Sequence, residues 1–143
     1  SLLASNLEAA SDVLARNLVE LARRMDLEGL NFSSAGRQEI CDFHDRVLAN
    51  VQLALSVMMA GQPDDARELV AQKEKVRGVE QKLQRKHLKR LHEGLSESIE
   101  TSNIHQETLR VLKQVNTSFA MVGYPILAET GDLLSSRLSP AES

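Results

Sequence analysis

The sequence predicts an all-α protein, an up-down-up-down antiparallel four-helix bundle, on three observations. Apolar side chains recur at spacings of three and four residues in four long segments. Aromatic residues make up 3% of the 143 residues and Trp is missing, whereas Leu, Ala, Glu and Lys are common, a mixture that suits long helices better than sheets. The links near residues 30, 62 and 96 are short, so consecutive helices must run antiparallel.

The first two segments have recognisable ends. The first helix is expected from about Leu2 to Leu27, with Gly29 as its stop. Ser33 or Ser34 can cap the second helix, which is expected to end at Gly61. The inward side chains predicted for this second helix are Ile40, Phe43, His44, Val47, Val51, Ala54, Leu55 and Met58.

The third segment has charges at both ends that match a helix dipole. Pro63 suits a first helical position, and Asp64 and Asp65 occupy the first turn. Basic side chains fill the last turn before Gly94, namely Lys89, Arg90 and His92. The predicted inward residues are Leu69, Val76, Val79, Leu83, His87 and Leu91.

The fourth segment, from Ser96 to Leu127, has the strongest periodicity. One face carries Thr101, Ile104, Thr108, Val111, Leu112, Val115, Phe119, Val122 and Ile126. Pro125 should kink this helix or end it near Gly123. Residues 127–138 can add a turn or two, so we expect one domain over residues 1–138 and a frayed tail over 139–143.

Composition limits the function classes. The net charge of -3 and the few aromatics argue against nucleic acid as a partner. The single Cys41 cannot form an internal disulfide, and no signal peptide or long apolar run is present, which favours a cytoplasmic location. The chain lacks an initiator Met and begins within a helical pattern, so we expect it to be part of something longer.

Several stretches carry a family resemblance. They are Glu100 to Ser102, Ile104-His105, Leu109-Arg110, Lys113 to Asn116 and Tyr124 to Leu127, with Asp12 to Leu21, Phe32 to Gly36 and Val47 to Leu55 further upstream. Together they resemble the PhoU-like domain that follows the membrane part of bacterial sodium/phosphate cotransporter family proteins. The resemblance implies a cytoplasmic domain of an inner-membrane protein, whose partner is the membrane transporter part of the same full-length chain.

A buried polar layer is the first candidate site. Counting equal distances from each turn places Asn17, His44, Glu80 and Asn116 at one level of the bundle. A His beside a Glu suggests a metal or proton-handling site, but di-metal bundles need more carboxylates and two Glu-x-x-His pairs. A hydrogen-bonded layer that fixes the helix register is the favoured interpretation.

Glu8 and Asp12 form the second candidate site, because they lie one helical turn apart and can share a cation. They resemble the Glu/Asp-x-x-x-Asp motif with which PhoU proteins hold metal clusters. The corresponding positions on the third and fourth helices hold Lys73, Arg77, Lys113 and Thr117. Two carboxylates facing cations are few for a hard cation, so an acidic edge paired with Lys or Arg is favoured.

The third candidate is a basic run on the third helix. It comprises Lys82, Arg85, Lys86, Lys89 and Arg90. A solvated helix face is the usual role of such a run, and contact with anionic lipid or a phosphate species is the functional alternative.

Two imidazoles are expected at similar heights. His87 and His105 do not by themselves define a metal site, and a His satisfied by a neighbouring side chain near Glu100, Thr101 and Ser102 is favoured.

The sequence favours a non-enzymatic regulatory or interaction domain in phosphate transport. No nucleophile, base and oxyanion site converge; Cys41 and His44 in particular point in different directions on their helix. No cofactor is expected. The alternatives are a metal-binding protein built on Glu8 and Asp12, and a dimerisation module, since long bundles often pair.

Overall fold

A computed structural model describes residues 32–94 and 99–131, and within these ranges every element is a helix. The elements are α2 (Ser34–Ala60), α3 (Pro63–His92), α4 (Ile99–Ala120) and α5 (Gly123–Thr130). Isolated positions nearer the N-terminus are also described, each helical and exposed, namely Ser5, Glu8, Ala9, Asp12, Arg16, Glu20 and Arg23. In the described ranges, no helix has both the length and the apolar character needed to cross a bilayer.

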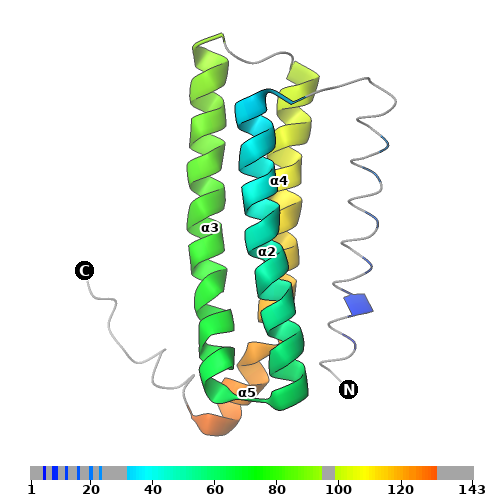
Figure 1. Ribbon diagram of the computed structural model, residues 1–143, viewed down its shortest axis with the longest axis vertical. Coiled ribbons are helices and arrows are strands. Elements are labelled where there is room, and N and C mark those ends of the chain that lie inside the picture. Colours follow the sequence, from blue (N-terminus) through cyan, green and yellow to red (C-terminus); the bar gives the residue numbers. More distant parts are fainter. Residues whose placement is uncertain are drawn as a thin grey trace, which may run out of the picture.

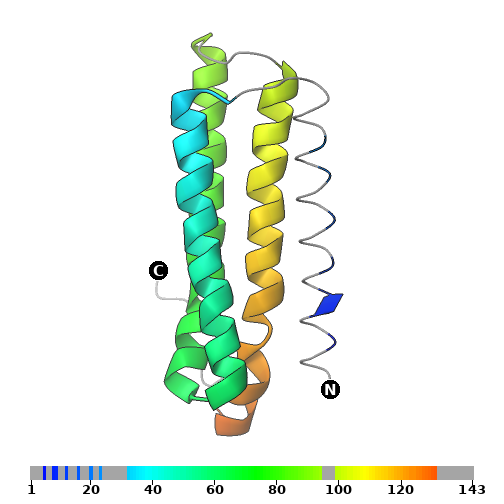
Figure 2. The ribbon, with the colours of Figure 1, turned by 45° about the vertical axis from the view of Figure 1, so that its right-hand side comes forward.

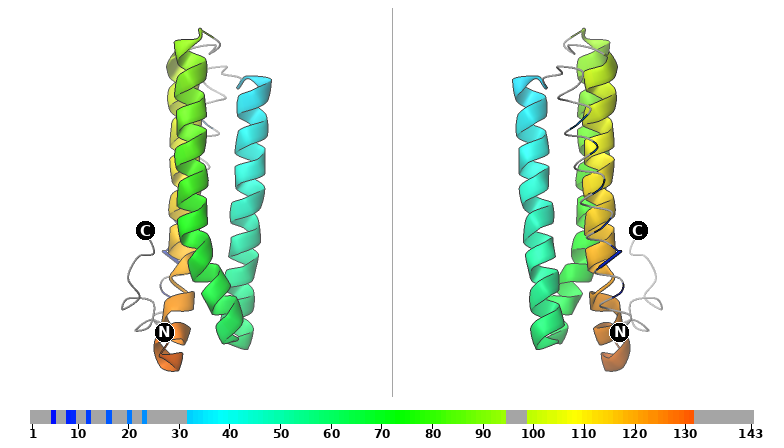
Figure 3. Two further views of the ribbon diagram at one scale, coloured as in Figure 1. Left: turned by 90° about the vertical axis from the view of Figure 1, so that its left-hand side faces the viewer. Right: turned by 90° about the vertical axis from the view of Figure 1, so that its right-hand side faces the viewer.

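The three long helices lie side by side, with α3 running opposite to α2 and α4 (Figure 1). Turning the molecule shows α4 alongside the α2–α3 hairpin (Figure 2), and α5 lies at the end where α2 meets α3 (Figure 3). The all-α prediction is confirmed. The predicted first helix and the tail lie mostly outside the described residues, so a four-helix bundle is not confirmed and the described part is a three-helix bundle with a short α5.

The ends of α2 and α3 follow from local chemistry. The backbone N–H of Gly36 donates to Ser33 Oγ at 3.1 Å, which caps α2 as predicted. Gly61, with φ 62°, ends α2 in the left-handed conformation, and Pro63 begins α3 after a two-residue link. So short a link forces α2 and α3 into an antiparallel hairpin.

The predicted interruption of the fourth helix is confirmed. α4 ends at Ala120, and α5 begins at Gly123 after the turn at Met121 and Val122. Pro125 has no N–H, and its ring would clash with the carbonyl of Met121 in a continuous helix. The turn lets α5 pack against the first part of α3.

The core is a large apolar cluster between the helices, and a second, smaller cluster consists of Ile104 and Val111 with Phe32 packed against them. The best buried members of the large cluster are Phe43, Ala54, Val57, Ala66, Leu69, Val76, Leu109, Val115 and Val122. The inward faces predicted for the third and fourth helices are largely confirmed, but that of α2 is rotated. His44, Leu55 and Met58 are exposed instead of inward, because the buried α2 stripe runs through Asn50 and Val57.

Two glycines on helices give opposite stability predictions. A Cβ on Gly123 would lie 3.0 Å from the carbonyl oxygen of Ala66 and 3.0 Å from Val70 Cγ2, whereas a Cβ on Gly78 meets nothing within 4 Å. We expect Gly123→Ala to lower the free energy of unfolding by about 1–3 kcal/mol through overpacking. Gly78→Ala should raise it by about 0.5–1 kcal/mol through helix propensity. Urea unfolding measures both, and equal effects would contradict the close α3–α5 contact.

Candidate functional site

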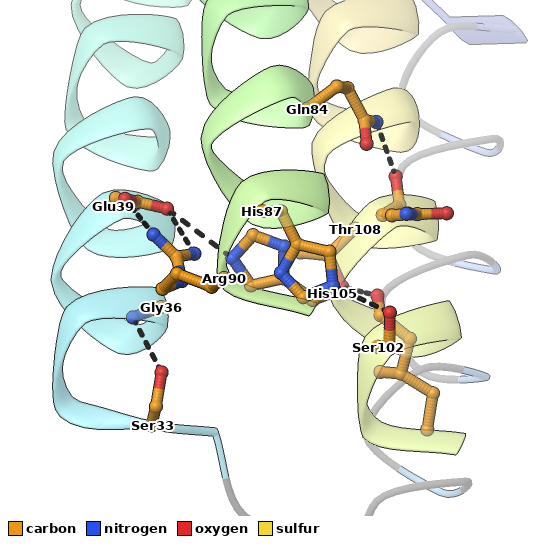
Figure 4. Close-up of polar contacts among 11 residues, drawn as sticks. Ser33, Gly36, Glu39, Gln84, His87, Arg90, Ser102, His105 and Thr108 are labelled. Atoms are coloured by element: carbon orange, nitrogen blue, oxygen red, sulfur yellow. Dashed lines mark hydrogen bonds and ion pairs between the residues drawn. The ribbon is translucent and has the colours of Figure 1, made fainter. Parts of the chain in front are cut away.

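A cluster of polar side chains lies where the first turns of α2 and α4 meet the last turns of α3 (Figure 4). Its members are Glu39 from α2, His87 and Arg90 from α3, and Ser102 and His105 from α4. We call these five residues the polar cluster. It joins buried and partly buried polar side chains from three helices, which makes it a candidate site.

Glu39 and Arg90 form a two-pronged ion pair across α2 and α3. Arg90 Nη1 donates to Glu39 Oε1 at 2.6 Å, and Nη2 donates to Oε2 at 2.8 Å. Both side chains are largely buried, with exposures of 15% for Glu39 and 17% for Arg90. Burial alone raises the pKa of Glu39, but the hydrogen bonds and charge of Arg90 outweigh burial and hold that pKa below its usual range. The same hydrogen bonds raise the pKa of Arg90.

His87 and His105 stack on each other, which confirms the prediction that they lie at similar heights. Their ring centroids are 4.3 Å apart, and the ring planes differ by 12°. A hydrogen bond of 2.6 Å joins His87 Nε2 and Ser102 Oγ. Burial, and then the charge of Arg90, lower the pKa of His87. His87 thus has the neighbouring side-chain partner that the sequence led us to expect.

His105 is the more deeply enclosed of the two rings. Phe32 meets it edge to face at 5.7 Å between centroids, and a Cβ on Gly36 would lie 3.2 Å from its Cδ2, a tight contact that glycine avoids. Its Nε2 lies 3.8 Å from Glu39 Oε2, too far for a hydrogen bond. Burial first, and the neighbouring His87 second, lower the pKa of His105 to about 4.

The geometry of the two imidazole rings in the polar cluster does not suit metal binding. Lone pairs on a ring nitrogen lie in the ring plane, so two nearly parallel stacked rings do not aim at one common point. Among the described residues, no three His, Cys, Asp or Glu side chains are placed to hold a metal ion. The cluster therefore offers a neutral imidazole pair beside a fixed ion pair.

The predicted polar layer is only partly present. Asn116 and Glu80 are buried, as predicted, but their hydrogen bonds go elsewhere. Asn50 Nδ2 donates to Asn116 Oδ1 at 2.7 Å, and Gln84 Nε2 donates to Glu80 Oε1 at 3.3 Å. The prediction that His44 belongs to this layer is wrong, because its side chain is 53% exposed and contacts Asp45 on the outer face of α2. Asn17 lies outside the described residues.

The buried Asn50–Asn116 pair gives a second stability prediction. Asn116→Ala would leave the Asn50 amide buried without its partner, and we expect a loss of about 1–3 kcal/mol in the free energy of unfolding. Replacing both residues by Leu removes both polar groups and should recover most of that loss. Urea unfolding of the single and double variants tests this. A double variant as unstable as the sum of two single variants would contradict it.

The other two candidate sites fare differently. Glu8 and Asp12 are both helical and exposed, and metal binding there stays a prediction. The prediction that Arg90 belongs to the basic run available to a membrane is wrong, because Arg90 turns inward and pairs with Glu39. The remaining members are exposed on α3, namely Lys82, Arg85, Lys86 and Lys89. Of these, Lys89 approaches Glu93 at 4.0 Å.

Sequence reasoning missed two of the central residues. Glu39 has no nearby sequence signal, since its partner stands on another helix 51 positions away. Asn50 could have been found from the sequence, because it stands seven residues after Phe43 and seven before Val57. That spacing places it on the buried face of α2.

Comparison with known proteins finds relatives that are much longer than this chain. The chain is 35% identical over 127 residues to the "Putative inorganic phosphate export protein YjbB" of Salmonella typhimurium, and the match covers 89% of this chain but 23% of that protein. It is 33% identical over 124 residues to the Escherichia coli K12 protein of the same name, covering 87% of this chain and 23% of that protein. No family model and no solved structure matches the chain.

Proposed function

We propose that this chain is a non-enzymatic regulatory or interaction domain of a sodium-dependent membrane protein that moves inorganic phosphate. The observation that carries the proposal is the similarity over 89% of this chain to a protein named for phosphate export, of which the match covers 23%. In the proposal, the translocation path lies in the rest of the longer protein, on the inner membrane, and this helical domain acts on it from the cytoplasmic side.

The described polar groups support a role without catalysis. Two acid–base candidates are engaged by other side chains, Glu39 by Arg90 and His87 by Ser102, and the ring of His105 is enclosed. Two rows of exposed side chains remain for contact with another surface. Exposed apolar side chains on α2 include Leu48, Leu55 and Met59, and exposed basic ones on α3 include Lys82, Arg85 and Lys86. We propose that the α3 row faces anionic lipid while the domain docks on the transporter.

Phosphate flux in cells tests this proposal. Full-length protein and a variant lacking this domain are expressed at equal membrane levels, and phosphate movement is followed with radiolabelled phosphate. We expect the truncated protein to move phosphate still, with an altered rate or an altered dependence on phosphate concentration. Identical flux in both would overturn the regulatory role, and unchanged flux when choline replaces sodium would overturn the sodium dependence.

A further inference from the structure

A cleft of about 540 Å³ opens between α3 and α4. It lies towards the C-terminal end of α4, away from the polar cluster. Its lining comes from Lys73, Glu74 and Arg77 on α3 and from Lys113, Gln114, Thr117 and Ser118 on α4. The volume is within the range of about 300–1,000 Å³ typical of small-ligand sites. The cleft is thus large enough to hold a ligand, and its chemistry decides which kind.

The helix register places the cleft side chains in two facing pairs. Gln84 Nε2 donates to the carbonyl oxygen of Gln106 at 3.2 Å, and Gly123 lies against Ala66, so α3 and α4–α5 run antiparallel in a fixed register. Continuing that register puts Lys73 opposite Thr117 and Arg77 opposite Lys113. Within each helix the two positions are one turn apart, so they share a face.

The charge of the cleft is opposite to that of the chain. Three cationic side chains and one carboxylate line it, whereas the whole chain carries a net charge of -3. The carboxylate, Glu74, lies 3.6 Å from Arg77. Lys113 has no carboxylate partner among the described residues. An excess of positive charge in a concave site attracts anions.

Neighbouring side chains fix the cleft's shape and supply neutral donors. Lys73 Nζ lies 5.7 Å from the ring centroid of Tyr124 on α5, a cation–π contact that positions the ammonium at one end of the cleft. Thr117 and Ser118 are only partly exposed, and their hydroxyls can donate hydrogen bonds to an acceptor between the helices. The break between α4 and α5 is what brings Tyr124 to this place.

We infer that the α3–α4 cleft is a binding site for a phosphate group. Lys73, Arg77 and Lys113 would contribute charge-assisted hydrogen bonds, and Thr117 and Ser118 neutral ones. Ammonium, guanidinium and hydroxyl groups are the side-chain donors that bind phosphate oxygens in proteins. The cleft chemistry alone selects an oxyanion of this type, and the choice of free inorganic phosphate over a lipid phosphate rests on the proposed function.

Titration of the purified 143-residue chain with inorganic phosphate tests the site. Calorimetry at low ionic strength gives the dissociation constant, and amide shifts in NMR spectra locate binding at Thr117 and Ser118. We expect Lys113→Gln and Arg77→Gln each to weaken binding about tenfold or more, the loss of one charge-assisted contact. The matched control is Arg110→Gln, which removes an exposed charge from the same helix one turn outside the cleft and should change binding less than twofold.

Vesicles distinguish the source of the phosphate group. Phosphatidylglycerol vesicles, with phosphatidylcholine vesicles for comparison, are tested against the same variants and against Lys86→Gln on the exposed basic row. Vesicle binding lost in Lys113→Gln but kept in Lys86→Gln supports the cleft as a lipid-phosphate site. Phosphate binding that Lys113→Gln leaves intact overturns the inference. So does vesicle binding without phosphate binding, if it is lost in Lys86→Gln and kept in Lys113→Gln, and so does an absence of binding by both probes with the variants correctly folded.

The site and the proposed function can fail separately. Lys113→Gln in the full-length protein should change the dependence of flux on phosphate concentration if both hold. Phosphate binding to the chain with no flux difference on removing the domain would leave the cleft assignment standing and remove the regulatory role. If removing the domain changes flux but the chain binds neither phosphate nor lipid, the regulatory role stands and the cleft assignment is removed.

Discussion

Glu39→Gln is expected to lower the free energy of unfolding by about 3 kcal/mol, the largest effect of any single change in the polar cluster. The variant keeps the shape of the side chain but removes its charge. Arg90 would then stay in a largely buried position, 17% exposed, with no counter-charge. A guanidinium has no accessible neutral form, so it cannot escape the penalty by losing a proton.

Two controls separate the ion pair from general disturbance of the bundle. Glu93→Gln removes the carboxylate near Lys89, a pair at 4.0 Å with exposures of 50% and 76%, and should cost less than about 0.5 kcal/mol. The double change Glu39→Leu with Arg90→Met removes both charges, and we expect it to recover most of the loss. Urea unfolding at pH 7.5 measures all three variants. A Glu39→Gln loss no larger than that of Glu93→Gln would contradict the importance of the buried pair.

Helix boundaries were predictable because their causes are local. Ser33 caps α2 through a hydrogen bond to a residue three positions away, and Pro63 and Gly61 act through their own backbone preferences. Pro125 interrupts the last helix in the same way. Each of these effects needs only a few neighbouring residues, which the sequence displays directly.

Side-chain contacts between helices were harder to predict, because they depend on rotation and axial shift. The predicted inward face of α2 included His44 and left out Asn50, whereas Asn50 is buried and His44 is exposed. The pair between α3 and α4, His87 with His105, was placed correctly by counting from the turn. Counting from the α2–α3 turn would place Glu39 nearest Gln84, whereas Arg90 stands more than one turn further along α3.

The α3–α4 cleft illustrates a different limit of prediction from sequence. The resemblance to PhoU proteins marked four positions where carboxylates were expected, and they hold three cations and one hydroxyl instead, Lys73, Arg77, Lys113 and Thr117. Only the register of α3 against α4 shows that these four side chains border one hollow. The cations at these positions argue against metal binding, and the same cations are the basis for proposing an anion site.

Acidification is expected to destabilise the protein between pH 6.5 and 4, chiefly through His105. The pKa of His105 is lowered from 6.5 to about 4 in the folded chain, so between these values the unfolded chain binds more protons than the folded one. Stability is therefore complete above pH 6.5 and falls as the pH drops towards 4. From pH 7.5 to pH 5 the expected loss is about 2 kcal/mol.

The other titrating members of the polar cluster act in the same direction. The pKa of His87 is also lowered, so His87 contributes a loss of protein stability as the pH falls below 6.5. The pKa of Glu39 is lowered from 4.5, so its contribution is present above that value and disappears below it. At His87 the positive charge of Arg90 opposes protonation more than the carboxylate of Glu39 favours it. At His105 the carboxylate of Glu39 outweighs Arg90, and burial together with His87 keeps the pKa low.

His105→Leu isolates the contribution of this ring. Leu is close in volume to His and brings no nitrogen into a place where both ring nitrogens of His105 lack hydrogen-bond partners, so the variant should fold with near-normal stability at pH 7.5. Its loss between pH 7.5 and pH 5 should be less than half that of the parent, with His87 accounting for the remainder. His44→Gln, on the exposed face of α2, should follow the parent curve. Urea unfolding at several pH values gives these slopes, and parallel curves for His105→Leu and the parent would show that the enclosed imidazole does not carry the acid sensitivity.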